Sequence, residues 1–306
     1  MKLPENWLVC LCMLSVASLV FAEGVTVVSE PLRFAAPLSA PAVYWKEVRS
    51  TPRPLRLHFL LVDLASPELE VAVAVADDPD GEGPAMATLR KPIEFAKERD
   101  FFAAINANAF MHLLHATEEE KKKGWYTGKP VRLFGLTIED GELRNRHDVR
   151  RVPLWINDTG TVRIGPPRTA DEPKYAVADW DGPILHDGVV VENSNAARHP
   201  RTVAGTDKTG NRLLMLVAEG RKETYSEGLT LQECGEIMQA YGCTDAINFD
   251  GGGSSVMLIT TNGVLSAVGH PQGRYLRPLP VLLGVRKVLD DDDSRITRAT
   301  DSEKPE

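Results

Sequence analysis

The sequence predicts an α+β protein with mixed, largely antiparallel sheets that are built from hairpins, and with a few helices packed on them. Short apolar runs alternate with turn signals along most of the chain, and several of these turns contain Asp-Gly or Asn-Gly. Both dipeptides favour the tight turns that join antiparallel strands. Only two segments space their apolar residues as a helix does, so we expect few helices.

The expected hairpins follow one another along the chain. In the first, the runs 57–64 and 69–76 flank a turn at 65–68. The others are expected at 131–138 with Asp140-Gly141, at 152–164 around 158–160, at 184–191 with Asp187-Gly188, at 202–217 around 208–211, and at 256–265 with Asn262-Gly263. Each of these patterns is typical of two strands joined by a short turn.

Two helices are expected between the strands. The first covers about 91–99, with Pro92 in its first turn, a position that tolerates proline. The second covers 230–241, where Thr230 begins a capping box and Gly242 ends the helix.

Each helix leads into a short apolar strand, the first at 101–105 and the second at 246–249. Both strands end in small and polar residues, and polar groups at two strand ends predict a shared cleft.

The chain is expected to divide into four parts. Residues 1–22 are expected to be a signal peptide, 23–55 an extended proline-containing lead-in, 56–288 the main domain, and 289–306 a disordered acidic tail. The apolar run 7–22 is short for a membrane span and ends in Val20-Phe21-Ala22, which is typical of a cleavage site. We therefore expect a secreted or periplasmic protein with no stable membrane span after signal removal; an uncleaved amino-terminal anchor is the alternative.

Charge and cysteine content exclude some classes of function. The net charge is −8, which argues against nucleic acid as a partner. Cys234 and Cys243 are the two cysteines outside the expected signal peptide. One lies within the second helix and the other just beyond it, so we expect buried free thiols rather than a disulfide.

The most informative segment is 245–257, which reads Asp-Ala-Ile-Asn-Phe-Asp-Gly-Gly-Gly-Ser-Ser-Val-Met. Three successive glycines cost backbone entropy, roughly 0.5–1 kcal/mol each relative to alanine. They are typical of backbone that needs positive φ or close approach to a ligand, and their N–H groups can bind an anion. A tight turn between strands is the simpler reading. The carboxylate of Asp250 and the hydroxyls that follow favour a site for an anionic, hydroxyl-bearing ligand.

Other candidate residues have both a functional and a structural interpretation. Arg201 can pair bidentately with phosphate, or form a surface salt bridge. Glu219 stands at a strand end and is either catalytic or a solvated turn residue. Asn106 and Asn108 can bind sugar hydroxyls or form a turn. We expect no metal: His112 and His115 have helical spacing, but the run 118–123 after them looks like a solvated loop without a third ligand.

Taken in order, these segments resemble the phosphodiester glycosidase family over about residues 100–287. The resemblance rests on the segments 104–110, 182–188, His199-Pro200-Arg201-Thr202 with Gly205, Glu219-Gly220-Arg221, 228–233, 248–255 and Arg277-Pro278. Two segments depart from the family pattern. Asn106-Ala107-Asn108-Ala109-Phe110 stands where the family usually has Asn-Gly-Gly-Tyr/Phe-Phe, and Glu219-Gly220-Arg221 where it usually has Asp-Gly-Arg.

The resemblance implies that the protein hydrolyses the anomeric C–O bond of a sugar-1-phosphodiester, with no cofactor. The expected substrate is a phosphorylated glycan at the cell surface or outside the cell, such as an exopolysaccharide. The implied catalytic residues are Asp250, Glu219, Arg201 and His199. The implied substrate-binding residues are Asn106, Asn108, Thr202, Gly251, Gly252, Gly253, Ser254 and Arg277.

Asp250 is the first choice for the carboxylate that meets the oxocarbenium-like centre, and Glu219 the second. Two other classes stay open. One is a non-catalytic binder of an anionic glycan, and the other is a metal-dependent phosphoesterase that would cut the P–O bond.

Overall fold

The computed structural model describes residues 25–32, 34–35, 37–146, 148–270, 273 and 275–288. The expected signal peptide at 1–22 and the expected acidic tail at 289–306 lie outside these residues. In the part of the chain that is described, no helix is long and apolar enough to cross a membrane.

Strands dominate the structure, with 40% of residues in strands and 10% in helices, so the expected α+β protein is largely β. The largest sheet has eight strands in the order β1 (Thr26–Val27), β2 (Ala42–Arg49), β3 (Leu55–Asp63), β17 (Arg212–Ala218), β16 (Arg201–Thr206), β18 (Asp245–Asn248), β14 (Pro183–His186) and β15 (Val189–Val190). Its strand pairs are antiparallel apart from the parallel pair β1–β2.

Three smaller antiparallel sheets complete the fold. One five-stranded sheet has the order β20 (Val264–Val268), β19 (Met257–Thr261), β6 (Ala103–Asn106), β21 (Val281–Lys287) and β4 (Leu69–Val75). The other has β10 (Glu142–Asn145), β9 (Thr137–Glu139), β13 (Tyr175–Ala178), β11 (Pro153–Ile156) and β12 (Val162–Ile164). The three-stranded sheet contains β5 (Ala87–Thr88), β8 (Pro130–Leu133) and β7 (Phe110–Met111).

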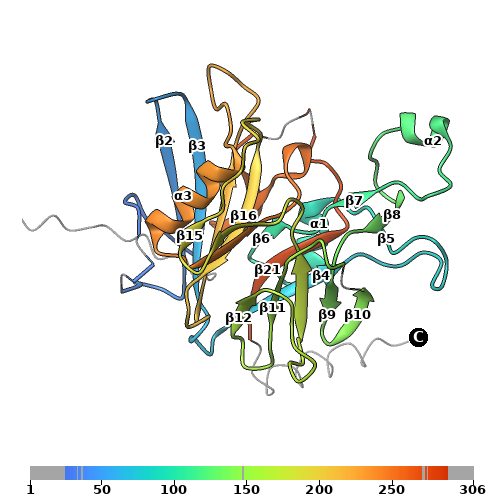
Figure 1. Cartoon of the computed structure of the whole chain (residues 1–306), viewed down its shortest axis with the longest axis horizontal. Coiled ribbons are helices and arrows are strands. Elements are labelled where there is room, and N and C mark those ends of the chain that lie inside the picture. Colours follow the sequence, from blue (N-terminus) through green and yellow to red (C-terminus); the bar gives the residue numbers. More distant parts are fainter. Residues whose placement is uncertain are drawn as a thin grey trace, which may run out of the picture.

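The eight-stranded sheet is buried on both faces, and this explains the continuous apolar run of β17. Leu213, Met215 and Val217 pack toward the sheet that contains β6, whereas Leu214 and Leu216 pack toward α3 (Leu231–Tyr241). Figure 1 shows α3 lying against this sheet. Successive strand residues point to opposite faces, so both faces need apolar side chains.

Both expected helices are present. α1 spans Pro92–Glu98, and α3 has the expected capping box and ends at Gly242, whose φ is +103°. Cys234 and Cys243 are buried free thiols, as predicted.

Five of the six expected hairpins are confirmed: β9–β10, β11–β12, β14–β15, β16–β17 and β19–β20 pair as antiparallel neighbours. The first expected hairpin is wrong. β3 pairs with β2 and β17, whereas β4 pairs with β21 in another sheet. The turn at 65–68 therefore carries the chain from one sheet to the next, because both strands found better partners far away in the sequence.

Two other expectations need correction. The run 118–123 is not a loop throughout, since Glu118–Lys122 form the helix α2 with a capping box from Thr117 and Glu120. Figure 1 shows α2 on an arm that projects from the sheets. The expected lead-in at 23–55 contains β2, which pairs with β3 over its whole length, so β2 is part of the main sheet.

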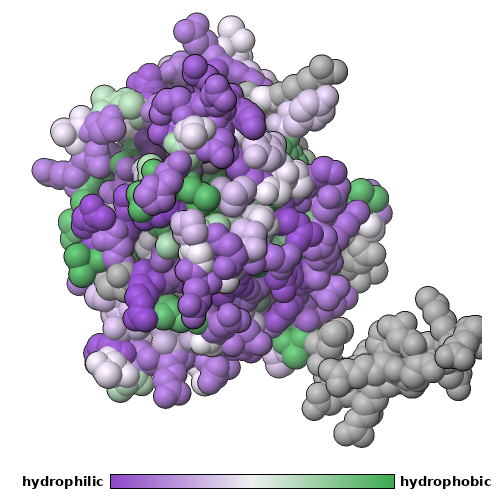
Figure 2. Space-filling view, turned by 90° about the vertical axis from the view of Figure 1, so that its right-hand side faces the viewer, coloured by the Kyte–Doolittle hydropathy of each residue, from purple (hydrophilic) through white to green (hydrophobic). Residues whose placement is uncertain are grey.

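The face of the molecule that carries the α2 arm is mainly hydrophilic (Figure 2). Hydrophobic residues appear there in small separate groups, and exposed apolar side chains of the arm include Met111, Leu114 and Tyr126. Singly exposed apolar residues are normal on a protein surface, so this face gives no sign of a broad docking patch.

Candidate active site

The ends of β6 and β18 lie together, although the two strands belong to different sheets. Asn106 at the end of β6 donates from Nδ2 to the carbonyl oxygen of Asp250 over 2.7 Å. Its Oδ1 accepts from the hydroxyl of Thr202 at 2.7 Å and from the N–H of Val256 at 3.1 Å. Asn106 and Thr202 are only 1% and 0% exposed, so their polar groups join three chain segments to one another.

The glycine run forms a turn against which two arginines lie. Gly252–Ser254 make a short 3-10 helix, and Gly252 has a φ of +61° that glycine adopts without strain. A methyl group at Gly252 would lie 2.9 Å from Nη2 of Arg221, and one at Gly253 would overlap the guanidinium of Arg277. The glycines therefore let two guanidinium groups approach the backbone directly.

A third arginine lies near the same turn. A methyl group at Gly251 would be 3.9 Å from Cδ of Arg201. Arg201 is 5% exposed, donates from Nε to the carbonyl of Leu229 at 3.1 Å, and has Nη1 3.6 Å from a carboxylate oxygen of Asp181. Burial and the charge of Arg221 lower the pKa of Arg201, while the charge of Asp181 acts in the opposite direction.

Arg277 completes the cationic cluster. Its Nη1 donates to the hydroxyl of Ser254 at 3.2 Å. Burial lowers its pKa, and so does the charge of Arg221, whereas the charge of Asp250 raises it. Arg221 therefore disfavours the charge of both Arg201 and Arg277, and three guanidinium groups around the glycine turn form a site suited to an anion with several oxygens.

Asp250 is the carboxylate at this cluster. Burial raises its pKa to about 6, against the opposing effects of the Ser254 hydrogen bond and the charge of Arg277. The negative charge of Asp181 contributes to the same rise. A carboxyl group that titrates near pH 6 in a site with perturbed neighbours is a candidate for catalysis.

His199 lies beside Arg221 at the edge of this cluster. Its Nδ1 is 3.4 Å from both Nε and Nη2 of Arg221. Burial lowers the pKa of His199, and the charges of Arg221 and Arg201 lower it further, so the ring is neutral at pH 7. A neutral ring that accepts at Nδ1 carries its proton on Nε2.

Glu219 lies in a separate network of hydrogen bonds. It is 6% exposed, and Oε1 is 3.0 Å from Nε2 of His58 and 3.3 Å from the hydroxyl of Tyr225. Oε2 accepts from the N–H of His270 at 2.8 Å. Burial alone would raise the pKa of Glu219, but the hydrogen bonds from His58 and His270 outweigh it and lower the pKa.

Asn108 is directed toward the neighbouring sheet. Its Nδ2 donates to the carbonyl of Phe134 at 2.8 Å and to the hydroxyl of Thr137 at 3.0 Å. The residue is 2% exposed, so the segment after β6 connects the cluster to β9 through this amide.

Two residues of the cluster were not singled out from the sequence. Asp181 precedes a glycine, and this Asp-Gly pair resembles an ordinary turn like those of the hairpins. Arg221 was part of a recognised segment, but its φ of +61° and its place against Gly252 appear only in the structure. Non-glycine residues with positive φ are uncommon and often lie at functional sites.

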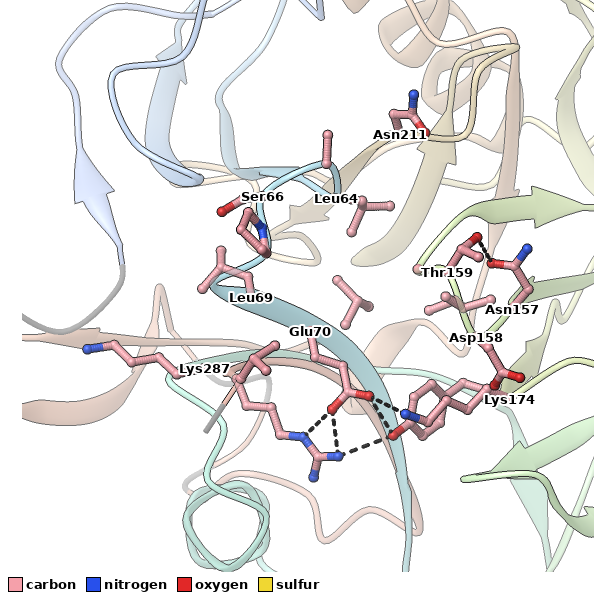
Figure 3. Close-up of a pocket in the computed structure, with 18 of the residues that line it drawn as sticks. Leu64, Ser66, Leu69, Glu70, Asn157, Asp158, Thr159, Lys174, Asn211 and Lys287 are labelled. Carbon is pink, nitrogen blue, oxygen red and sulfur yellow. Dashed lines mark hydrogen bonds and ion pairs between the residues drawn. The ribbon is translucent and has the colours of Figure 1, made fainter. Parts of the chain in front are cut away.

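A large cavity of about 1200 Å³ lies at the opposite ends of the strands that carry the cluster. Its wall includes Phe102 before β6, Asn211 before β17 and Lys287 at the end of β21. Figure 3 shows Glu70 there, and hydrogen bonds from Lys174 and Arg286 outweigh burial and lower its pKa. None of the expected site residues lines this cavity.

No group of three or more His, Cys, Asp or Glu side chains that could hold a metal ion occurs among the residues that the structure describes. His112 instead stacks on Trp125, with ring centroids 4.2 Å apart.

The fold occurs in solved structures of low sequence identity. The catalytic domain of zebrafish N-acetylglucosamine-1-phosphodiester alpha-N-acetylglucosaminidase, auto-inhibited by its pro-peptide, is similar with a TM-score of 0.61 and 18% identity, covering 84% of this chain and 86% of that chain. A hypothetical protein from Synechocystis has a TM-score of 0.55 and 14% identity, covering 82% of this chain and 64% of that one. No curated protein sequence matches the chain.

The sequence itself matches the family model of the phosphodiester glycosidases over residues 103–286. This match spans β6 to β21 and therefore contains the glycine turn, the three arginines and both aspartates. The chain is an enzyme of the phosphodiester glycosidase family.

Proposed function

We propose that this enzyme hydrolyses the anomeric C–O bond of a sugar-1-phosphodiester and releases the sugar and a phosphomonoester. The observation that carries the proposal is the placement of Arg201, Arg221 and Arg277 around the glycine turn, beside Asp250. The proposed substrate is a phosphorylated glycan at the cell surface or outside the cell, and the proposed location is secreted or periplasmic.

The arginines are suited to bind the phosphodiester and its departing monoester. Guanidinium groups bind phosphate oxygens bidentately, and the N–H of Gly253 adds a donor without a side chain in the way. The N–H of Gly252 instead donates to the carbonyl oxygen of Pro200 at 2.9 Å, and that of Gly251 to Asp250. Charge that develops on the leaving phosphate would be stabilised by groups that are already in place. A phosphate leaving group is a weak base, so this stabilisation matters more than a strong acid.

In this proposal the ionised form of Asp250 stabilises the oxocarbenium-like centre or attacks it. Glycoside hydrolysis generally uses two carboxyl groups on either side of the scissile bond. Asp181 is a better candidate than Glu219 for the second carboxyl group, because its charge acts on Asp250 and its side chain is 36% exposed. Glu219, by contrast, has both carboxylate oxygens engaged by protein donors.

The remaining residues have supporting or binding roles in this proposal. His199 would donate from Nε2 to a phosphate oxygen, and the hydroxyl of Ser254 would hold Arg277. Asn106 and Thr202 would support the turn through their mutual hydrogen bond rather than contact the substrate.

The test is hydrolysis in oxygen-18 water with a panel of sugar-1-phosphodiesters. The first compound to test is an N-acetylglucosamine-1-phosphodiester, because the name of the zebrafish enzyme of similar fold contains it. We expect the label on the sugar. Label on the phosphate would identify a phosphoesterase, and binding of the panel without turnover would identify a glycan-binding protein.

The same assay tests metal dependence. We expect activity to survive chelation and desalting. A loss that one divalent ion restores would contradict the proposed mechanism.

A further inference from the structure

Arg221 holds a backbone conformation that needs support from its surroundings. Its φ is +61°, in the left-handed region that costs free energy for residues other than glycine. It lies at the base of a tight loop, where its N–H donates to the carbonyl of Glu227 at 3.1 Å. Lys222 and Ser226 close the loop through reciprocal backbone hydrogen bonds of 3.1 and 2.8 Å.

The side chain of Tyr225 connects this loop to the buried carboxylate of Glu219. Its hydroxyl lies 3.3 Å from Oε1 of Glu219 and 2.6 Å from Nδ1 of His270. The guanidinium of Arg56 lies over the Tyr225 ring, 3.6 Å from its centroid. The hydroxyl of Ser226 donates to the carbonyl oxygen of Glu219 at 2.6 Å, so both ends of Glu219 hold the loop.

Donors and acceptors in this network match when Glu219 is ionised. Its two oxygens face donors from His58, Tyr225 and the backbone of His270. On the far side of His58, Nδ1 lies 2.8 Å from the hydroxyl of Tyr44. A neutral His58 that donates from Nε2 to Glu219 accepts at Nδ1 from Tyr44, so each group has a partner of the correct kind.

The network is buried and lies beside, rather than within, the arginine cluster. Tyr44, His58 and Glu219 are 9%, 1% and 6% exposed. None of them has a described contact with Asp250, whereas Arg221, two residues after Glu219, lies against Gly252. Glu219, the second candidate for the catalytic carboxylate in the sequence, can therefore affect the site only indirectly, through the position of Arg221.

We infer that Glu219, oriented by His58, is a positioning residue that holds the 220–226 loop so that the Arg221 guanidinium lies against Gly252 and binds phosphate. The inference rests on the proposed function for the identity of the anion. It assigns no bond-making step to Glu219. Its effect should appear in phosphate affinity and KM, and should depend on the presence of Arg221.

The experiment is a double-mutant cycle with Glu219→Gln and Arg221→Ala. We would measure the Kd for inorganic phosphate by calorimetry, and kcat and KM for a sugar-1-phosphodiester. Glutamine replaces one of the two carboxylate oxygens with an NH₂ group. One donor of the network would then face another donor and lose its hydrogen bond. We expect Glu219→Gln to weaken phosphate binding roughly tenfold, the size typical of a lost contact to a charged group. In the Arg221→Ala background it should have almost no further effect.

The matched control is Glu223→Gln, which removes the same charge from an exposed position on the same loop. It should leave phosphate affinity unchanged. Tyr225→Phe removes the hydroxyl that joins the loop to Glu219 and to His270, so it should weaken phosphate binding in the same direction even if Glu219→Gln fails to fold.

Equal losses from Glu219→Gln with and without Arg221 would overturn the inference. A loss of kcat with unchanged phosphate affinity would also overturn it, and would make Glu219 catalytic. If the wild-type protein binds phosphate but hydrolyses no sugar-1-phosphodiester, the proposed function fails. The double-mutant cycle, measured on the Kd for phosphate, still tests the positioning role in that case. If the wild-type protein binds no phosphate, the positioning role is refuted.

Discussion

The turns after β18 and β17 each place a buried acid next to a glycine, yet the two acids ionise differently. Burial raises the pKa of Asp250 to about 6. Burial acts on Glu219 in the same direction, but His58 and His270 supply hydrogen bonds that lower its pKa. The difference shows that the partners of a buried carboxylate, more than its burial, decide whether it stays ionised.

The two turns also differ in what remains available to a ligand. Around Asp250 the glycines lack side chains, and guanidinium groups lie against the backbone. Around Glu219 the protein itself supplies the donors for both oxygens. The first arrangement suits chemistry on an anion, and the second suits support of a neighbouring loop.

The strongest test of this comparison is the removal of charge at Asp250. Asp250→Asn keeps the size of the side chain but removes the charge that would meet the oxocarbenium-like centre. We expect kcat to fall roughly 10²–10³-fold, the usual size for one electrostatic contact in a transition state. Steady-state kinetics on protein with a wild-type circular dichroism spectrum would measure it. Near wild-type kcat would make Asp250 structural and direct attention to Asp181.

The pH dependence of kcat/KM should show which form of Asp250 is active. Burial gives Asp250 a pKa of about 6, so its ionised fraction falls as the pH drops below that value. If the carboxylate is the active form, kcat/KM should fall about tenfold per pH unit below pH 6. Burial also raises the pKa of Asp179 to about 6, so the fall in kcat/KM at low pH could come from either group. The fall is assigned to Asp250 if the residual activity of Asp250→Asn no longer shows it. A loss above pH 6 instead would indicate a general acid.

Gly253→Ala tests whether the glycines make room for arginine. Gly253 lacks positive φ, so alanine fits its backbone, but the added methyl group would overlap the guanidinium of Arg277. We expect Arg277 to shift and phosphate binding to weaken roughly tenfold. Calorimetry with inorganic phosphate would measure the change. The substitution should have little further effect in an Arg277→Ala background.

The smallest expected effect is a change in substrate preference in the variant Arg201→Lys. Lysine keeps the charge but loses the planar fork that binds phosphate bidentately. We expect kcat/KM to fall several-fold more for a sugar-1-phosphodiester than for an uncharged aryl glycoside of the same sugar. Equal losses on both substrates would show that Arg201 supports the fold through Leu229 rather than binding phosphate.

Local sequence patterns determined much of the secondary structure. The capping box of Thr230, the end of α3 at Gly242 and the hairpin turns at Asp140-Gly141, Asp187-Gly188 and Asn262-Gly263 all formed as predicted. Each depends on residues within a few positions of one another, so the sequence contains the whole interaction. The glycine run was also recognisable because three glycines in a row are costly without a reason.

Tertiary structure alone decided which strands pair and what surrounds each acid. β3 and β4 entered different sheets because their partners, β17 and β21, lie far along the chain. Glu219 obtained its low pKa from His58, 161 residues away. Asp181 and Arg221 joined the site through contacts with Arg201 and Gly252 that no local pattern contains. Packing brings such distant groups together, and the free energy of each contact exists only once the sheets have formed.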